Sequence, residues 1–257
     1  MESGFATPLL ELFKRGEVAP DVKMVAAQGA LAPRAHEQLG LLALLVRDPD
    51  PEIASTAEKT LQSASSEAVA AFLARPDAPT ELKTFFAARG IEPAAAGSDS
   101  DAPIIDTSPK TDEVEDDKDT QETALQRLAK MNVPQKVQRA TKGSREERSI
   151  LIRDPNKMIA MAVLSSPKLT IAEIEGFARA GNVAEDCLRV IATTRAWMKN
   201  YNVVAALTRN PKTPVALSMN LLSRLTEKDL RTLSTDRNVA DVLRITARKK
   251  LVLNKGD

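Results

Sequence analysis

A recurring corner motif constrains this chain more than any other feature of its sequence. Asp or Asn stands beside Pro, a few polar residues follow, and an apolar run comes next, as in RDPDPEI at 47–53, RPDAPTEL at 75–82, RDPNKMI at 153–159 and RNPKTPV at 209–215. Proline has no backbone N–H and disfavours helix in the residue before it, yet it fits the first position of a helix. Each corner therefore predicts that one helix ends and another begins.

The corners recur with a nearly constant period. In the first part of the chain the spacings are 29 and 27 residues, between Pro20, Pro49 and Pro76. In the second part they are 27, 29 and 27 residues, between Pro155, Asn182, Pro211 and Asn238. Both halves of the chain thus share one period, which is typical of a repeat architecture.

A second kind of break falls between the corners. Three capping-box-like starts predict it, namely Ser144 with Glu147, Thr170 with Glu173, and Thr226 with Asp229. Each period then holds two short helices, and such a pair must bury its apolar face against the next pair. We therefore predict an all-α fold of short-helix repeats, a HEAT-like α-solenoid. The alternative is two unrelated helical bundles whose corners are similarly spaced.

The amino-acid composition favours helices, and residues common in catalytic and metal sites, such as Cys and His, are scarce. Apolar residues make up 43% of the 257 residues but aromatic residues only 3%, which favours thin helix-on-helix cores. One cysteine, Cys187, excludes an internal disulfide, and one histidine, His36, leaves too few ligands for a zinc site or a Ser-His or Cys-His pair. We predict no catalytic, cofactor-binding or metal-binding residue, no small-molecule substrate and no enzymatic activity.

Charge divides the chain into three parts. Residues 1–95 carry 9 Lys and Arg against 13 Asp and Glu, residues 96–122 carry 2 against 10, and residues 123–257 carry 25 against 12. The middle part lacks apolar periodicity and is rich in Asp, Ser, Thr and Pro, so it cannot offset the entropy of ordering. The sequence predicts a small acidic helical-repeat domain, a disordered acidic linker and a basic helical-repeat domain with these bounds.

The start of the chain, MESGFATPLLELFKRGE, has an early acid and no basic leader, so it does not read as a signal peptide. Even the apolar run LGLLALLV at 39–46 stops at Arg47, far short of a membrane span. We expect no transmembrane segment and a cytoplasmic location.

The sequences around the corners also resemble those of a known class of helical proteins. The stretches DPNKMIAMAVLSSPKL at 154–169 and TRNPKTPVALSMNLLSRLT at 208–226 resemble bacterial HEAT-like and leucine-rich-repeat-variant helical solenoids. The resemblance covers most of 123–257 and, more loosely, 8–92. It implies an interaction surface and supplies no catalytic motif. Some leucine-rich-repeat variants have a cysteine-rich iron–sulfur segment, and a chain with one cysteine departs from that pattern.

Basic residues recur at helical spacing in the predicted C-terminal domain. They are candidates for a surface that binds a polyanion or a partner: Lys136, Arg139, Arg145, Arg148, Arg195, Lys199, Arg244, Arg248, Lys249 and Lys250. The alternative is that they form ordinary solvated helix faces, with cations near helix C-termini. The excess of 13 positive charges over this part of the chain (25 minus 12) favours an acidic partner.

Two functions follow from this pattern. The first is a non-enzymatic scaffold that binds a protein partner through a helical-repeat surface. The second is sequence-nonspecific binding of nucleic acid by the basic domain, through phosphate contacts. The acidic linker either masks that basic surface or is a soluble spacer, and the sequence leaves both open.

Four single residues carry separate expectations. Trp197 and Tyr201, four positions apart, form either an exposed stacking platform beside basic residues or an anchor between helices. Cys187 is expected to be a small buried residue. His36 is expected on a helix surface or in an interhelix hydrogen bond.

Overall fold

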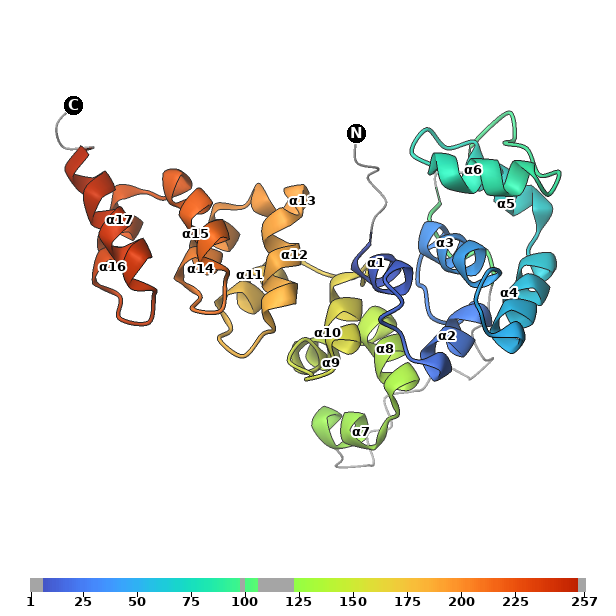
Figure 1. Ribbon diagram of the computed structural model, residues 1–257, viewed down its shortest axis with the longest axis horizontal. Coiled ribbons are helices and arrows are strands. Elements are labelled where there is room, and N and C mark those ends of the chain that lie inside the picture. Colours follow the sequence, from blue (N-terminus) through green and yellow to red (C-terminus); the bar gives the residue numbers. More distant parts are fainter. Residues whose placement is uncertain (1–6, 98–99, 106–122, 254–257) are drawn as a thin grey trace. The chain divides into compact units, whose positions relative to one another are not determined.

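The computed structural model describes residues 7–97, 100–105 and 123–253, and every regular element in these ranges is a helix (Figure 1). The all-α prediction is therefore confirmed. None of the helices in these ranges combines the length and the apolar content that a lipid bilayer crossing requires.

The chain divides into two compact units. The first comprises residues 1–148 with 165–167, and the second comprises 149–164 with 168–257. Helices of the first unit are α1 (Pro8–Lys14), α2 (Pro20–Ala27), α3 (Ala35–Leu45), α4 (Pro51–Ser63), α5 (Ser66–Leu73), α6 (Thr80–Ala87), α7 (Ala124–Lys130) and α8 (Val133–Lys142). The boundary between the units falls within α9 (Arg145–Leu151).

The second unit holds the remaining helices. They are α10 (Lys157–Leu164), α11 (Ile171–Arg179), α12 (Glu185–Thr193), α13 (Arg195–Met198), α14 (Tyr201–Arg209), α15 (Val215–Leu221), the 3-10 turn η1 (Leu222–Arg224), α16 (Glu227–Thr235) and α17 (Asp241–Leu253).

This division differs from the one predicted from charge, which placed α7 and α8 with the basic C-terminal domain. In the structure α8 packs against α2. The side-chain amide of Gln138 donates to the Ala30 carbonyl at 3.1 Å, and the hydroxyl of the buried Thr141 lies 3.5 Å from the Leu31 carbonyl. Burial and hydrogen bonding decide the grouping of these helices, whereas the sign of surface charge does not.

The corners contain a short side-chain-capped turn. Asp48, Asp154, Asn210 and Asp236 each accept, through a side-chain oxygen, the N–H of the residue two positions on, at 2.8–3.0 Å. This is the Asx turn that these residue types favour. It explains why Asp or Asn recurs at the corners, since its side chain closes the turn.

Proline occupies the predicted first helical position at some corners only. Pro20 begins α2 as expected, but the helices after Pro49, Pro155 and Pro211 begin later, at Pro51, Lys157 and Val215. At these three corners the proline lies inside the turn, because the Asx turn occupies the residues around it.

The capping boxes are confirmed at two of three sites. Thr170 and Glu173 make both reciprocal bonds, and so do Ser144 and Glu147. Thr226 caps α16 through its hydroxyl, but its own N–H donates to the Tyr201 hydroxyl at 3.0 Å. Two helices per period hold in most of the described chain, and α13 is an additional short helix between α12 and α14.

Part of the acidic stretch predicted as a linker is held on the first unit. Residues 100–105 have no helix, and they form hydrogen bonds to the first turn of α3 through Asp101 and Ile105. For these residues the linker prediction needs correction, because specific polar partners offset the entropy of ordering. Residues 106–122 lie outside the described residues.

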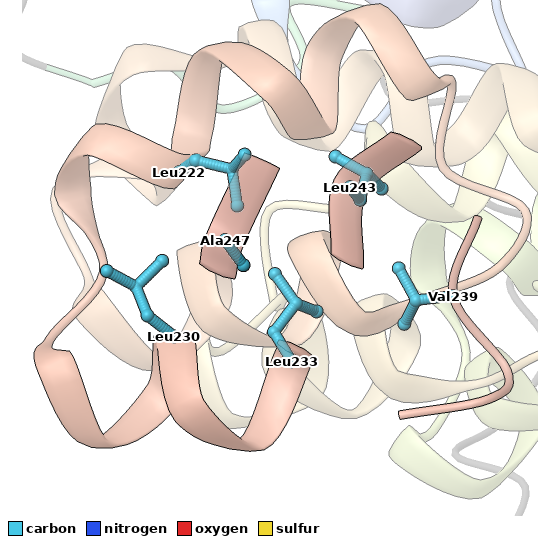
Figure 2. Close-up of a cluster of buried hydrophobic side chains, with 6 residues drawn as sticks. All are labelled: Leu222, Leu230, Leu233, Val239, Leu243 and Ala247. Carbon is cyan, nitrogen blue, oxygen red and sulfur yellow. The ribbon is translucent and has the colours of Figure 1, made fainter. Parts of the chain in front are cut away.

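In the second unit, short helices share apolar cores. Figure 2 shows one of them, in which side chains from η1, α16, α17 and the loop before α17 point toward one another: Leu222, Leu230, Leu233, Val239, Leu243 and Ala247. All six are buried. Met219, Leu225 and Leu251 pack around them. The helix α17 is thus held by one of its faces.

Asn210 joins two helix pairs in this unit. Its side-chain amide donates to the Ala178 carbonyl at 2.7 Å and the Ala180 carbonyl at 3.0 Å, at the C-terminal end of α11. Its oxygen accepts the Lys212 N–H at 2.9 Å. One buried side chain therefore caps α11 and closes the corner before α15.

We expect Asn210→Asp to destabilise the protein more than Asn210→Ala does. Alanine leaves the carbonyls unpaired, which costs about 1–3 kcal/mol, while aspartate keeps the turn but turns a carboxylate oxygen toward two carbonyl oxygens. Urea unfolding of both variants measures the difference. Equal stability of wild type and Asn210→Asp would contradict this role of the amide.

Glu37 is the least satisfied polar group of the first unit. It is 0% exposed, and neither carboxylate oxygen has a hydrogen-bond partner within standard geometry. Burial raises its pKa to about 7, and Asp101 adds to this rise, while the Thr7 hydroxyl and Arg34 pull the pKa down. The carboxyl is therefore most stable in this position when it is protonated.

The raised pKa predicts a pH-dependent stability. The protonated carboxyl contributes fully below its ordinary pKa of 4.5, and this contribution is lost as the pH rises through about 7. The loss amounts to about 3 kcal/mol. Glu37→Gln cannot ionise, so the free energy of unfolding of this variant should lack that decline.

Urea unfolding across this pH range checks the prediction. Glu92→Gln is the matched control, because Glu92 is exposed, and its unfolding curve should follow that of wild type at each pH. Parallel pH profiles for wild type and Glu37→Gln would show that Glu37 is not buried as an unpaired acid.

Candidate interaction surface on the C-terminal helix

The helix α17 is apolar on two opposite faces. Leu243 and Ala247 point into the core shown in Figure 2. A second apolar face lies on the other side, at positions three, ten and eleven residues after its first member. It consists of Val242, Ile245, Val252 and Leu253, which are 55%, 50%, 71% and 70% exposed. An amphipathic helix of a globular protein normally shows polar residues there.

Cations flank this second face. Toward the end of α17 the side chains of Arg248, Lys249, Val252 and Leu253 form an open, nearly flat surface. We call the four apolar residues together with Arg248 and Lys249 the α17 outer face. The other large exposed apolar side chains in the described ranges, Leu125, Ile171, Tyr201 and Val215, come from different helices. Isolated residues of that kind are common on protein surfaces.

Hydrogen bonds fix the position of Arg248. Its guanidinium donates twice to the Ser234 carbonyl, at 3.2 and 3.0 Å, near the C-terminal end of α16. Arg244 pairs with Asp241 on the same helix. Lys249 is exposed on the outer face, whereas Lys250 is half-buried. The charge presented beside the apolar residues is therefore positive.

The ten basic residues predicted as one surface belong to both units. Lys136, Arg139, Arg145 and Arg148 fall in the first unit, and the other six fall in the second. In the second unit Arg195 and Lys199 lie at the ends of α13, apart in the chain from the four residues of α17. Of these ten residues, Arg248 and Lys249 lie beside Val252 and Leu253 at the end of α17.

Arg148 requires a correction. It is buried, and its guanidinium donates to the Gly143 carbonyl at 2.8 Å, so it is not available to a surface ligand. Arg139 lies 3.6 Å from the Glu147 carboxylate, an ion pair that reduces its use for an external anion. Regular helical spacing identified both residues, but spacing does not say which face is covered.

Tyr201 acts as an anchor between helices. Its hydroxyl bonds to the hydroxyl of Thr226 at 3.1 Å and to the carboxylate of Asp229, which also pairs with Arg209. The bond from Tyr201 lowers the pKa of Asp229, and Thr226 and Arg209 add to this effect. This network connects α14 with α16, and Trp197 is half-buried. The stacking-platform interpretation therefore loses its support.

Cys187 and His36, whose side-chain types serve in metal and redox sites, are both buried. Cys187 is buried, as predicted, with its sulfur 3.9 Å from that of Met161, and burial raises the pKa of its thiol to about 12. His36 is buried and contacts Asp101. Within the described part of the chain, no three His, Cys, Asp or Glu side chains converge on one point as metal ligands would.

Sequence reasoning missed the α17 outer face. The signal was present in DVLRITARKKLVL, where one apolar set (Leu243, Ala247 and Leu251) has helical spacing and a second set interleaves with it. The pattern of basic residues, taken alone, does not indicate this second apolar set.

Paired alanine variants test the distinction between the two faces of α17. Leu243→Ala should cost about 2–5 kcal/mol of unfolding free energy, because it leaves a cavity in the core. Ile245→Ala should change stability by no more than about 0.5 kcal/mol, because it removes an exposed side chain. Chemical denaturation measures both. A large loss for Ile245→Ala would mean that the outer face is covered.

Comparison with known proteins identifies no family for this chain. No family model, no curated protein and no solved structure matches the chain. Its function is therefore inferred from its own residues.

Proposed function

We propose that this chain is a non-enzymatic interaction scaffold that binds a protein partner through the surface of its stacked short helices, with the α17 outer face as the contact. The observation that carries the proposal is the two-sided apolar character of α17. One side is packed in the core, and the other exposes four large apolar side chains. Exposed apolar residues that share one helix face mark an interaction site more often than scattered residues do.

The packing of short helices against one another in the second unit supports a scaffold. In the second unit α14 packs against α11 and α15, and α16 packs against α17. Asx turns recur at the corners between the pairs. We propose that these pairs are HEAT-like repeats of an α-solenoid, since such repeats use ridged helical surfaces to bind other macromolecules.

Charge at the α17 outer face favours an acidic amphipathic helix as the occupant. Val252 and Leu253 offer apolar contact area, and Arg248 and Lys249 belong to the same open surface. A partner helix with an apolar stripe bordered by Asp or Glu would satisfy both features. Two copies of this chain paired through α17 would bring Arg248 and Lys249 close to their own counterparts, which charge repulsion disfavours.

Nucleic-acid binding by the basic C-terminal unit is the alternative function. Arg195, Lys199, Arg248 and Lys249 are exposed and could contact phosphates. The apolar residues of the outer face have no use in such contacts, and for that reason a protein partner is preferred. Masking by the acidic stretch remains a hypothesis, and the Asp101 carboxylate of that stretch already contacts His36.

Site-specific photocrosslinking in cells tests the proposal. A photoreactive phenylalanine analogue replaces Ile245 in one variant and Ala172, which is exposed on α11, in another. The variant at position 245 should give a discrete adduct with a protein that carries an acidic amphipathic segment, and the variant at position 172 should give none. Mass spectrometry identifies the adduct.

Two matched variants make the result specific. Val252→Ser with Leu253→Ser, introduced beside the photoreactive residue, should remove most of the adduct. Val215→Ser removes an isolated exposed apolar residue from α15 and should leave the adduct unchanged. The same crosslinking, repeated in cell lysate at about 50 and about 200 mM salt, tests the alternative: a nuclease-sensitive adduct whose yield falls steeply over that range would favour nucleic acid, since salt weakens phosphate contacts. Absence of any discrete adduct at position 245 would overturn the proposal.

A further inference from the structure

The first turn of α3 is held by a segment that is distant in sequence. Arg34, the residue before α3, provides no side-chain cap. Instead the N–H of Ala35, the first residue of the helix, donates to the Asp101 carbonyl at 3.0 Å. An N–H of this kind has no partner within its own helix and needs an external acceptor. Residues 100–105 supply that acceptor.

Gln38 forms hydrogen bonds with the other end of the same segment. Its buried amide group donates to the Ile105 carbonyl at 2.8 Å and accepts the Ile105 N–H at 2.9 Å. It also donates to the Gly29 carbonyl at 2.9 Å, which fixes its orientation. The side chain thus pairs with both main-chain polar groups of one residue, as a neighbouring β-strand would. Such pairing recognises an extended backbone and not a particular side chain.

Between these two contacts, the Asp101 carboxylate lies against the His36 ring. Nδ1 of His36 lies 3.2 and 3.1 Å from the two oxygens of Asp101. Burial lowers the pKa of His36, although the contact with Asp101 acts against this. Because a carboxylate only accepts hydrogen bonds, we infer that Nδ1 carries the proton. Arg75 adds a bond to the Ser100 carbonyl at 3.2 Å and lies 3.6 Å from Asp101.

The segment itself is attached mainly by its backbone. Ala102 and Pro103 are exposed, and Ile104 and Ile105 are half-buried. The receiving groups, by contrast, are buried: His36 is 6% and Gln38 is 1% exposed. With the segment in place the Gln38 amide is paired with the Gly29 carbonyl and with both main-chain polar groups of Ile105. The asymmetry between an exposed segment and a buried receiving surface is that of a peptide in its site.

We propose that the first turn of α3 is a peptide-binding site, formed by Ala35, His36, Gln38 and Arg75, and that residues 100–105 occupy it in cis. Its ligand is an extended acidic segment with a carboxylate four residues before a main-chain N–H and C=O pair. An acidic segment of another protein takes the place of residues 100–105 when it exceeds their effective concentration, which is of millimolar order for a tethered segment. This site lies in the first unit and is independent of the α17 outer face.

Hydrogen exchange on the full-length chain tests the occupied state. The amides of Ala35 and Ile105 should be protected in wild type. Asp101→Ala should increase the exchange rate of both by at least tenfold, and the control Glu92→Ala, which changes an exposed acid of the same connection, should leave both rates unchanged. Exchange of the wild-type Ile105 amide at the rate of an unprotected amide would overturn the proposal without any variant.

Binding in trans tests the site. The probe is a fluorescein-labelled peptide with the sequence of residues 100–105, SDAPII. A full-length double variant, Asp101→Ala with Ile105→Pro, loses the carboxylate and the N–H of the cis segment. It should bind the peptide at least tenfold more tightly than wild type does, in fluorescence anisotropy titrations up to millimolar peptide.

Two controls assign that binding to the α3 site. Gln38→Ala, added to the double variant, should abolish binding, and a peptide with Ala in place of Asp should bind at least tenfold more weakly. If the double variant loses its helical circular dichroism, Asp101→Asn alone takes its place, with the same expected direction. Equal affinity for wild type and a folded variant, or absence of binding to that variant, would overturn the proposal.

Discussion

Every helix in the described parts of this chain depends on its neighbours, because each is too short to be stable alone. The helices run from 4 residues in α13 to 13 residues in α4 and α17. Isolated helices shorter than about 12–15 residues are marginal in water. Two things compensate here: the burial of one apolar face against another helix, and the capping of the unpaired backbone groups at each end. The corners, the polar networks and both candidate surfaces follow from these two requirements.

Local chemistry could be predicted from the sequence, and long-range partners could not. The Asx turn at Asp154 and the capping box of Thr170 and Glu173 involve residues two or three positions apart, so a short stretch of sequence contains both partners. Asn210 shows the limit. Its place in a corner was readable, but its bonds to Ala178 and Ala180 join residues about thirty positions apart, and nothing in RNPKTPV specifies them. The hydrogen bonding of Ile105 to Gln38 could not be predicted from a short stretch of sequence for the same reason.

Charge proved a poorer guide than apolar spacing. The excess of positive charge predicted a basic surface that includes Arg148, yet this residue is buried against the Gly143 carbonyl. Long side chains with cationic ends serve as caps as readily as they serve as ligand contacts, and Arg248 does so at the Ser234 carbonyl. The α17 outer face was readable in principle, since Val242 and Ile245 stand three residues apart on one side of the helix. Recognising it required knowing that Leu243 and Ala247 already fill the core.

The two proposed sites arise where the requirements of short helices are met from outside the local sequence. At α3 the helix start has no side-chain cap of its own, and the segment with Asp101 provides the acceptor. At α17 the helix has two apolar faces but one covering neighbour pair in its unit, α15 and α16. In the first case a backbone group needs a partner, and in the second an apolar surface does. The chemistry of the ligand follows in each case from what is missing: an extended acidic backbone at α3, and an apolar helix with acidic borders at α17.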